Sequence, residues 1–399
     1  AGGRLEDGDY VGATFMTGTL SHGSGLSRGF DVYYEALVGH ELVWVDNPWS
    51  KFRSELLLSI VRNKVLQRFD ASRVASVAAE WFREHGRKRF VAMVHFYSTH
   101  TPYDPPQEFR DMYCDPDYAG PITSFYAEHR HAIEAPGGLE LLTEADRRQI
   151  RDLYYAGTSQ ADAMIGEVLA ELEHQGVLGD TLVIVTSDHG EELGEHDVWE
   201  HNWMWQTNLR IPLVMTLPGR IPAGARVSAL AETVDIVPTA CALLGVAPPH
   251  HPEEPEGRGL IDGHDLMPLV RGEVERVREF AFSENGDFIA IQDAAWKLIV
   301  AREAVDPEAW GRALGARDRT RPRLYDLAGD PGERDNLLDE RADQAERLIA
   351  ALREWDARMP IPRLDVVRSS RDVEHLMKSL GYTGDEGQDV PEPAPPGGK

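Results

Sequence analysis

Asp188 and His189 place a carboxylate and an imidazole side by side, directly after an apolar, β-branched run at residues 181–186. A run of that length and composition predicts a strand buried on both faces of a parallel sheet. Ligands gather at the carboxyl ends of such strands, where an oxygen of Asp188 and a nitrogen of His189 can share one cation. Adjacent side chains on a regular strand point to opposite faces, so the chain must bend there, and the following Gly190 permits a bend.

Three further carboxylates follow in the same loop, at Glu191, Glu192 and Glu195. A solvated acidic loop after a strand end is the alternative interpretation, because Asp-His-Gly alone is a weak signal for a metal site. The two interpretations differ in whether other chemistry-bearing side chains meet this strand end.

His100 is a candidate for such a side chain. It follows a second apolar run at residues 90–97, which predicts another buried strand, and it lies in a loop, residues 98–106, that contains three prolines. Prolines stiffen a loop, and a rigid loop at the carboxyl end of a strand is a suitable mount for one catalytic imidazole. A loop histidine without a role is the competing interpretation. We therefore expect His100 to meet Asp188 and His189 at a common anion pocket.

Helices must position these two strands. Apolar residues recur at helical spacing in residues 72–85 and 144–172, which predicts one helix before each strand. Gly86 and Gly176 are expected to end these helices in the left-handed conformation. Such alternation of helices and strands is typical of an α/β fold with a parallel sheet.

The later part of the chain continues with further elements. We expect a core strand at residues 211–217 and a helix at residues 233–245. The inward face of that helix is predicted to carry Val237, Ala240, Cys241 and Leu244. After a change of composition near residues 271–278, we expect three short strands and a helix, at residues 280–283, 288–292, 295–301 and 342–359.

The charge balance restricts the partners of the protein. Its 399 residues contain 41 Lys and Arg against 67 Asp and Glu, a formal net charge of −26, which argues against nucleic acid or an anionic membrane as partner. An anionic substrate must then be attracted by local charge, such as a metal ion. Two cysteines do not form a disulfide framework and leave the compartment undecided. The sequence contains neither a secretory signal nor a transmembrane run, and it indicates no oligomeric state.

The stretch around Asp188 resembles the sulfatase family of the alkaline phosphatase superfamily. The residues that carry the resemblance are Ser187-Asp188-His189-Gly190-Glu191, Gly194-Glu195-His196, His201 and Leu209-Arg210-Ile211-Pro212-Leu213. The resemblance implies that Asp188 and His189 bind a divalent ion, usually calcium, and that His201 contacts the sulfate group. The segment that begins at His100 resembles the family's His-x-Pro-Tyr segment, whose histidine also contacts the sulfate. His189, where many members have Asn, also admits manganese or magnesium.

The resemblance extends over most of residues 9–359 and implies an alkaline-phosphatase-like α/β fold, with a mostly parallel sheet flanked by helices. We expect a sulfatase core in residues 1–272 and a small C-terminal α+β subdomain, with an antiparallel sheet and a helix, in residues 273–370. Residues 384–399 contain no aromatic residue and no periodicity, and they are predicted to form a disordered tail.

The nucleophile motif of the family, Cys-or-Ser-x-Pro-x-Arg, is not found in this chain. Cys114 begins a Cys-x-Pro sequence, but Tyr118 stands where Arg is required, and the order of motifs is wrong. In sulfatases the Cys or Ser is converted to formylglycine, and a pair of adjacent Asp completes the metal site. Because the chain begins at Ala1 without an initiator Met, we expect these groups upstream of residue 1. A degenerate, non-catalytic homologue is the alternative.

The sequence therefore predicts a sulfatase-like hydrolase that acts on a small-molecule or glycan sulfate ester, with calcium as the expected ion. Two alternatives stay open. One is a phosphate or phosphonate ester hydrolase, or a phosphoethanolamine transferase, on the same fold, which an isolated Thr or Ser nucleophile would indicate. The other is a metal-binding or interaction protein that kept the fold and lost the chemistry.

Overall fold

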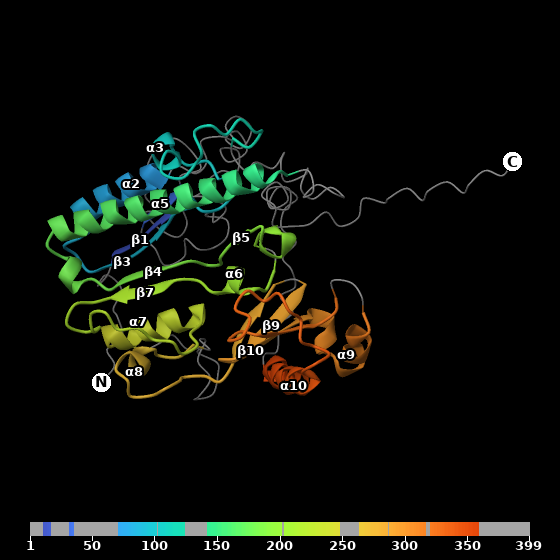
Figure 1. Ribbon diagram of the computed structural model, residues 1–399. Coiled ribbons are helices and arrows are strands. Elements are labelled where there is room, and N and C mark those ends of the chain that lie inside the picture. Colours follow the sequence, from blue (N-terminus) through green and yellow to red (C-terminus); the bar gives the residue numbers. More distant parts are fainter. Residues whose placement is uncertain are drawn as a thin grey trace, which may run out of the picture. The chain divides into compact units, whose positions relative to one another are not determined.

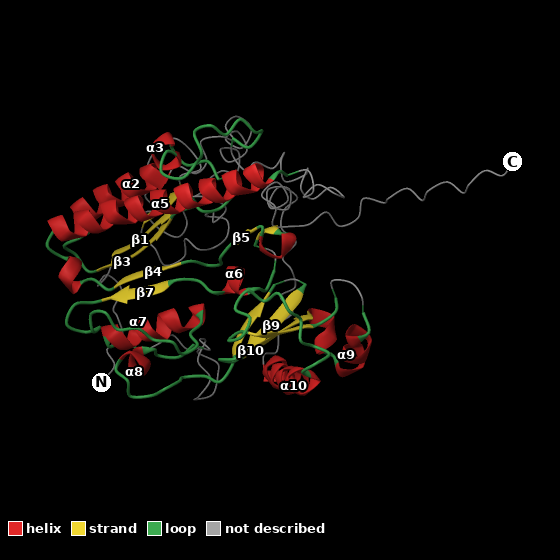
Figure 2. Cartoon of the chain, viewed as in Figure 1, coloured by secondary structure: helices red, strands yellow, loops and turns green. Residues whose placement is uncertain are grey.

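The computed structural model describes residues 11–16, 32–35, 71–101, 103–123, 142–201, 203–247, 263–285, 287–316 and 320–358 (Figure 1). The chain divides into two compact units, Ala1–Arg353 and Glu354–Lys399, and nearly all described residues belong to the first. Helices and strands alternate along it (Figure 2), in agreement with the predicted α/β class.

Three parallel strands form the first sheet: β1 (Val11–Met16), β2 (Val32–Glu35) and β3 (Phe90–His95), in the order β2-β1-β3. Helix α2 (Ala71–His85) packs on this sheet because its apolar face, which includes Val74, Trp81 and Phe82, is buried against it. The run at residues 90–97 was expected to form a buried strand. Instead Val91 and Met93 are 52% and 42% exposed, because α2 covers the other face of β3.

The long helix α5 (Glu144–His174) lies against α2, and Val168 and Leu172 join the same apolar cluster. Thr143 begins α5 with a capping box, since its hydroxyl accepts from the Asp146 amide while the Asp146 carboxylate accepts from the Thr143 amide. Gly176 follows the helix with a φ of 72°, as predicted.

Gly86, in contrast, does not adopt the left-handed conformation predicted for it. Its amide donates to the carbonyl of Phe82 at 2.7 Å, and a Cβ at this position would lie 2.5 Å from that carbonyl oxygen. The glycine after α2 is therefore required by close approach to the helix and not by a positive φ.

Strand β4 (Val183–Thr186) pairs with β7 (Leu213–Thr216) in antiparallel fashion. We had expected the strand at residues 181–186 to lie in a parallel sheet with both faces buried. Among the described residues its ladder partner is antiparallel, because the chain turns back through the loop that carries Asp188 and returns as β7. The residues of β4 are half-buried, and Thr186 is exposed.

Helix α7 (Ile236–Leu244) follows a short 3-10 turn (Thr233–Asp235) and buries a different face from the one predicted. Val237 and Leu244 are 46% and 48% exposed, whereas Thr239 and Leu243 are buried. The hydroxyl of Thr239 donates to the carbonyl of Asp235 (2.7 Å) and accepts from the amide of Leu266 (2.9 Å). These polar bonds turn the threonine face inward, which apolar periodicity alone does not indicate.

Four antiparallel strands form the last sheet, in the order β11-β10-β9-β8. They are β8 (Ala281–Glu284), β9 (Phe288–Gln292), β10 (Trp296–Ala301) and β11 (Arg323–Asp326). Their positions confirm the predicted short strands, and α10 (Ala342–Arg358) confirms the helix expected at residues 342–359. The boundary near residue 272 stays a prediction, and the predicted tail, residues 384–399, lies outside the described residues.

Shorter elements connect these parts. They are α3 (Gln107–Arg110), β5 (Glu192–Leu193), β6 (Trp199–Glu200), α6 (Gln206–Leu209), α8 (Met267–Val270), α9 (Pro307–Leu314) and 3-10 turns at Leu178–Asp180, Glu195–Asp197 and Arg302–Val305. Within the described ranges, every helix is either too short or too polar to cross a membrane.

Candidate active site

His100 is held in a turn that follows β3. Its backbone amide donates to the carbonyl of Tyr97 at 3.0 Å, and its ring stacks on the Tyr97 ring with centroids 4.1 Å apart. Gly157 of α5 supports the same loop, since a Cβ at this position would lie 2.2 Å from the carbonyl oxygen of Ser98. The long helix therefore sets the position of the loop that carries His100.

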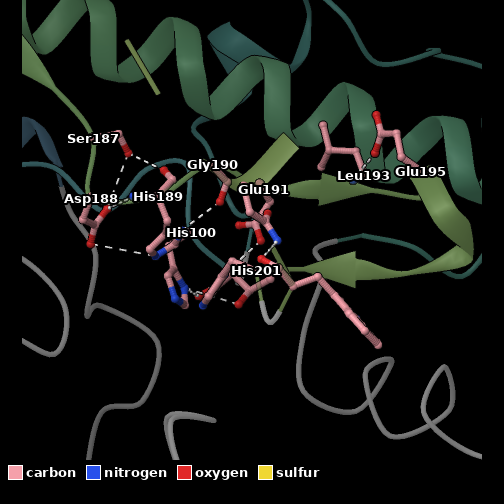
Figure 3. A network of polar contacts seen from close by, with 12 residues as sticks. His100, Ser187, Asp188, His189, Gly190, Glu191, Leu193, Glu195 and His201 are labelled. Carbon is pink, nitrogen blue, oxygen red and sulfur yellow. Dashed lines mark hydrogen bonds and ion pairs between the residues drawn. The ribbon is translucent and has the colours of Figure 1, made fainter. Parts of the chain in front are cut away.

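Three imidazoles, His100, His189 and His201, meet beyond the ends of β3 and β4 (Figure 3). Their ring centroids are 4.1 Å apart for His189 and His201, 4.9 Å for His100 and His201, and 6.3 Å for His100 and His189. We call these three side chains the imidazole cluster. The convergence of His100 with Asp188 and His189 that the sequence led us to expect is therefore present in the fold.

The side chains of Asp188 and His189 lie close enough to share one ion. Oδ2 of Asp188 is 3.8 Å from Nε2 of His189. Nδ1–H of His189 donates to the carbonyl of Gly190 at 2.8 Å, so the lone pair is on Nε2, as in metal-ligating histidines. Oδ1 of Asp188 accepts from the His189 amide at 3.0 Å. Oxygen and nitrogen donors at this separation fit one divalent ion, whose ligands lie at about 2.0–2.6 Å.

The electrostatics of Asp188 favour its charged form. Burial alone would raise the pKa of its carboxyl, but the charges of His189 and His95 and two backbone hydrogen bonds outweigh burial and lower it. His95, the last residue of β3, thereby connects this strand electrostatically to the loop after β4.

His100 is neutral at physiological pH. Burial and the charge of His201 lower the pKa of its imidazole to about 3, and the opposing hydrogen bond to Thr101 does not compensate. That bond runs from Nδ1–H of His100 to the carbonyl of Thr101 at 2.7 Å. The proton is therefore on Nδ1, and Nε2 is a proton acceptor.

His201 has the opposite preference. Burial alone would lower the pKa of its imidazole, but a hydrogen bond to Glu191 and the negative charge of that carboxylate raise it above the ordinary value. Nδ1–H of His201 donates to Oε1 of Glu191 at 2.9 Å. His201 directly follows Glu200, whose φ of 70° lies in the left-handed region that residues other than glycine rarely adopt.

The other two acidic side chains of the loop face elsewhere. Glu192 is fully buried and accepts hydrogen bonds from the hydroxyl of Thr207 and from Nδ1–H of His196, the latter at 3.3 Å. Glu195 accepts from the amide of Leu193 at 2.6 Å, and Figure 3 shows this pair apart from the imidazole cluster. Neither carboxylate joins Asp188 and His189.

Gly190 allows two backbone segments to approach closely. A Cβ at this position would lie 1.9 Å from the carbonyl oxygen of Thr207, and the Gly190 amide donates to the carbonyl of Asn208 at 2.8 Å. The loop after β4 is thus tied to α6, and this contact fixes its course past Asp188 and His189.

Two family models match long segments of the chain. A family model described as Sulfatase matches residues 22–246 of the 399-residue chain, which is more than half of it. The chain belongs to the sulfatase family. A second model, described as N-sulphoglucosamine sulphohydrolase, C-terminal, matches residues 194–357 of this sulfatase-family chain.

The curated relatives include arylsulfatases of animals, and their sequence identity to this chain is modest. Arylsulfatase K of Xenopus laevis is 29% identical over 243 residues, which are 57% of this chain and 40% of the relative. The chain thus spans less than half the length of this curated sulfatase.

Solved structures share the fold of this sulfatase chain. A protein in complex with its substrate D-glucosamine-2-N,6-O-disulfate has a TM-score of 0.57 at 19% identity, over 96% of this chain and 82% of that one. The phosphonate monoester hydrolase of Agrobacterium radiobacter has a TM-score of 0.57 at 22% identity, over 88% of this chain and 78% of that one. At these identities the likeness shows the alkaline-phosphatase-like fold alone.

Sequence reasoning missed the groups that hold the cluster of this sulfatase in place. Glu191 was noted only as an acidic residue of the loop and of the stretch that resembles sulfatases, and Tyr97 and His95 only as strand residues. The β5–β6 hairpin was not predicted, and it is this hairpin that places Glu191 opposite His201. The available signal was that Glu191 and Glu192 are adjacent. Adjacent side chains on a strand point to opposite faces, so only one of these two carboxylates can face the histidines of the site.

A glycine-to-alanine pair tests the support that α5 gives to the His100 loop. Gly157→Ala is expected to lower the free energy of unfolding by about 1–3 kcal/mol, because the new Cβ would overlap the Ser98 carbonyl. Gly166→Ala, in the same helix with nothing within 4 Å, is expected to raise it by about 0.4–1 kcal/mol. Urea denaturation measures both variants, and equal effects would contradict the proposed contact.

Proposed function

We propose that the complete protein hydrolyses a sulfate ester at a divalent-metal site, part of which this chain supplies. The convergence of Asp188 with the imidazole cluster beyond β3 and β4 carries the proposal. A sulfate ester needs both a cation and proton-transfer groups within reach of its oxygens, and carboxylate and imidazole side chains provide for both. Membership of the sulfatase family supports the same reaction.

Asp188 and His189 would hold the metal ion together with ligands from elsewhere. Within the described part of the chain, no group of three or more His, Cys, Asp or Glu could hold an ion by itself. Calcium suits oxygen-rich ligands and a hard anion, and the nitrogen of His189 also admits manganese or magnesium. When bound, the ion supplies Lewis-acid stabilisation of the sulfate oxygens. Formylglycine, the general nucleophile of the family, would come from outside the described residues.

The two other histidines would take different parts in the reaction. The raised pKa of His201 keeps its imidazole protonated to higher pH than usual, so its Nε2–H can donate to a sulfate oxygen. Neutral His100, with its proton on Nδ1, would present the Nε2 lone pair as a hydrogen-bond acceptor for the attacking hydroxyl, and its low pKa makes it an orienting group rather than a base.

Ester hydrolysis by the full-length protein tests the proposal. We expect release of sulfate from an aryl sulfate, loss of this activity after metal removal with EDTA, and recovery with calcium, manganese or magnesium. A preference for phosphate or phosphonate monoesters over the sulfate ester would replace the proposal by phosphoryl chemistry. Metal retention without hydrolysis of any of these esters would indicate a non-catalytic homologue.

A further inference from the structure

We infer that Glu191 is a positioning residue for His201: its buried carboxylate fixes the tautomer and orientation of that imidazole. The catalytic consequence of this inference rests on the proposed function, whereas the positioning itself does not. The β5–β6 hairpin brings the two residues together: Glu192 pairs with Glu200, and Glu191 and His201 are the next opposed positions.

The contact itself has the geometry of a charge-assisted hydrogen bond. Oε1 of Glu191 accepts Nδ1–H of His201 at 2.9 Å, and both side chains are largely buried, at 4% and 15% exposure. A carboxylate accepts only, so it keeps a proton on Nδ1 in the protonated ring and selects the Nδ1–H tautomer in the neutral ring, and Nε2 is left for contacts on the other side. His201 stacks on His189 and lies next to His100, so the bond to Glu191 fixes the orientation of a ring inside the imidazole cluster.

The backbone on both sides of Glu191 is fixed by hydrogen bonds. The hairpin that follows it is fixed by pairing of Leu193 with Trp199, and the amide before it, that of Gly190, is bonded to Asn208. Tyr103, fully buried, lies beside Glu191, and burial and the charge of that carboxylate raise the pKa of the phenol far above its ordinary value. Tyr103 belongs to the same buried apolar cluster as Leu193 and Trp199 of the hairpin, so the neighbour of Glu191 is itself part of the core.

The neighbouring residue provides a matched comparison inside the same loop. Glu192 is buried even more deeply than Glu191, at 0% against 8% exposure, and it also accepts a hydrogen bond from an imidazole, that of His196. Because successive side chains point to opposite faces, this second pair faces away from the cluster and stacks with Trp205, 4.0 Å between ring centroids. Two adjacent carboxylate–imidazole pairs therefore differ mainly in whether the histidine belongs to the imidazole cluster.

The direct test reads the tautomer of His201 by nuclear magnetic resonance of the full chain labelled with 15N-histidine. At a pH at which the His201 ring is neutral, we expect the parent chain to carry the ring proton on Nδ1 and none on Nε2. Glu191→Ala is expected to give a mixture of tautomers, and Glu191→Gln to retain the parent form because the amide oxygen can accept the same bond. Glu192→Ala is expected to leave the His201 signals unchanged. No substrate is involved, so this readout stands even if the proposed function fails.

Kinetics of the full-length protein, with whichever ester it hydrolyses, give the second readout. Glu191→Ala is expected to lower kcat about 10- to 100-fold, the range found when partners of site histidines are removed, with little change in KM. Glu191→Gln should restore part of the loss. In a His201→Ala background, Glu191→Ala should lower kcat by no more than about twofold, because its effect on kcat passes through the missing imidazole.

Three results would overturn the inference: an unchanged His201 tautomer in Glu191→Ala, equal losses of kcat in Glu191→Ala and Glu192→Ala, or an undiminished effect of Glu191→Ala without His201. Thermal unfolding of each variant accompanies these measurements. A merely structural role would lower stability in both carboxylate variants without moving the tautomer or the coupling to His201.

Discussion

Replacing Asp188 by Asn together with His189 by Ala is expected to abolish retention of the divalent metal ion in the full-length protein. The double variant removes the anionic oxygen and the nitrogen that lie 3.8 Å apart at the end of β4. Metal ions contribute several kcal/mol of charge stabilisation to such reactions, so ester hydrolysis should fall by at least about 10³-fold. Elemental analysis of the purified variant measures the metal, and initial rates measure the reaction.

An adjacent carboxylate and imidazole elsewhere in the chain provide the control. Glu173 and His174 are both exposed near the end of α5, and Glu173→Gln with His174→Ala changes the same kinds of group. This control should retain the metal content and rate of the parent. Full metal occupancy in the Asp188/His189 double variant would contradict the assignment of these two residues as ligands.

Lys297→Met is expected to destabilise the protein by about 3–5 kcal/mol, because it leaves a carboxylate buried without its cation. Lys297 of β10 is completely buried and forms an ion pair with Glu333, which is also buried. Glu333 in turn accepts a hydrogen bond from the backbone amide of Gln206, at the start of α6. The pair thus connects the C-terminal sheet to the segment that follows His201.

Urea denaturation of the chain measures this loss. The double variant Lys297→Met with Glu333→Gln removes both charges and should recover a large part of the stability, since the desolvated carboxylate is then gone. Arg302→Met removes the cation of the partly exposed ion pair with Glu284. This change should lower the free energy of unfolding by less than about 1 kcal/mol. Similar losses for Lys297→Met and Arg302→Met would show that the buried ion pair does not stabilise the fold.

Local pattern was sufficient for many of the elements and for the polar residue types that follow β3 and β4. Apolar runs and helical spacing predicted β3, β4, α2 and α5, and of the last sheet β8, β9 and β10. The polar residues directly after two of these strands, Asp188, His189 and His100, were predicted to meet, because the ends of neighbouring strands come together whatever their detailed packing. The resemblance to sulfatases added His201.

The direction of side chains depended on contacts far apart in the sequence. The inward face of α7 is set by the bonds of Thr239 to Asp235 and Leu266, and the pairing of β4 is set by the return of the chain as β7. Neither leaves a trace in local periodicity.

The sequence by itself determined which residue types stand at the ends of β3 and β4, and hence the kind of chemistry available there. Only the tertiary structure decided that Glu191 faces His201 while Glu192 faces His196, and that His100 is neutral while the pKa of His201 is raised. The physical reason is that burial and hydrogen bonding set protonation and tautomer, and both come from side chains that the fold, and not the chain order, places next to each imidazole.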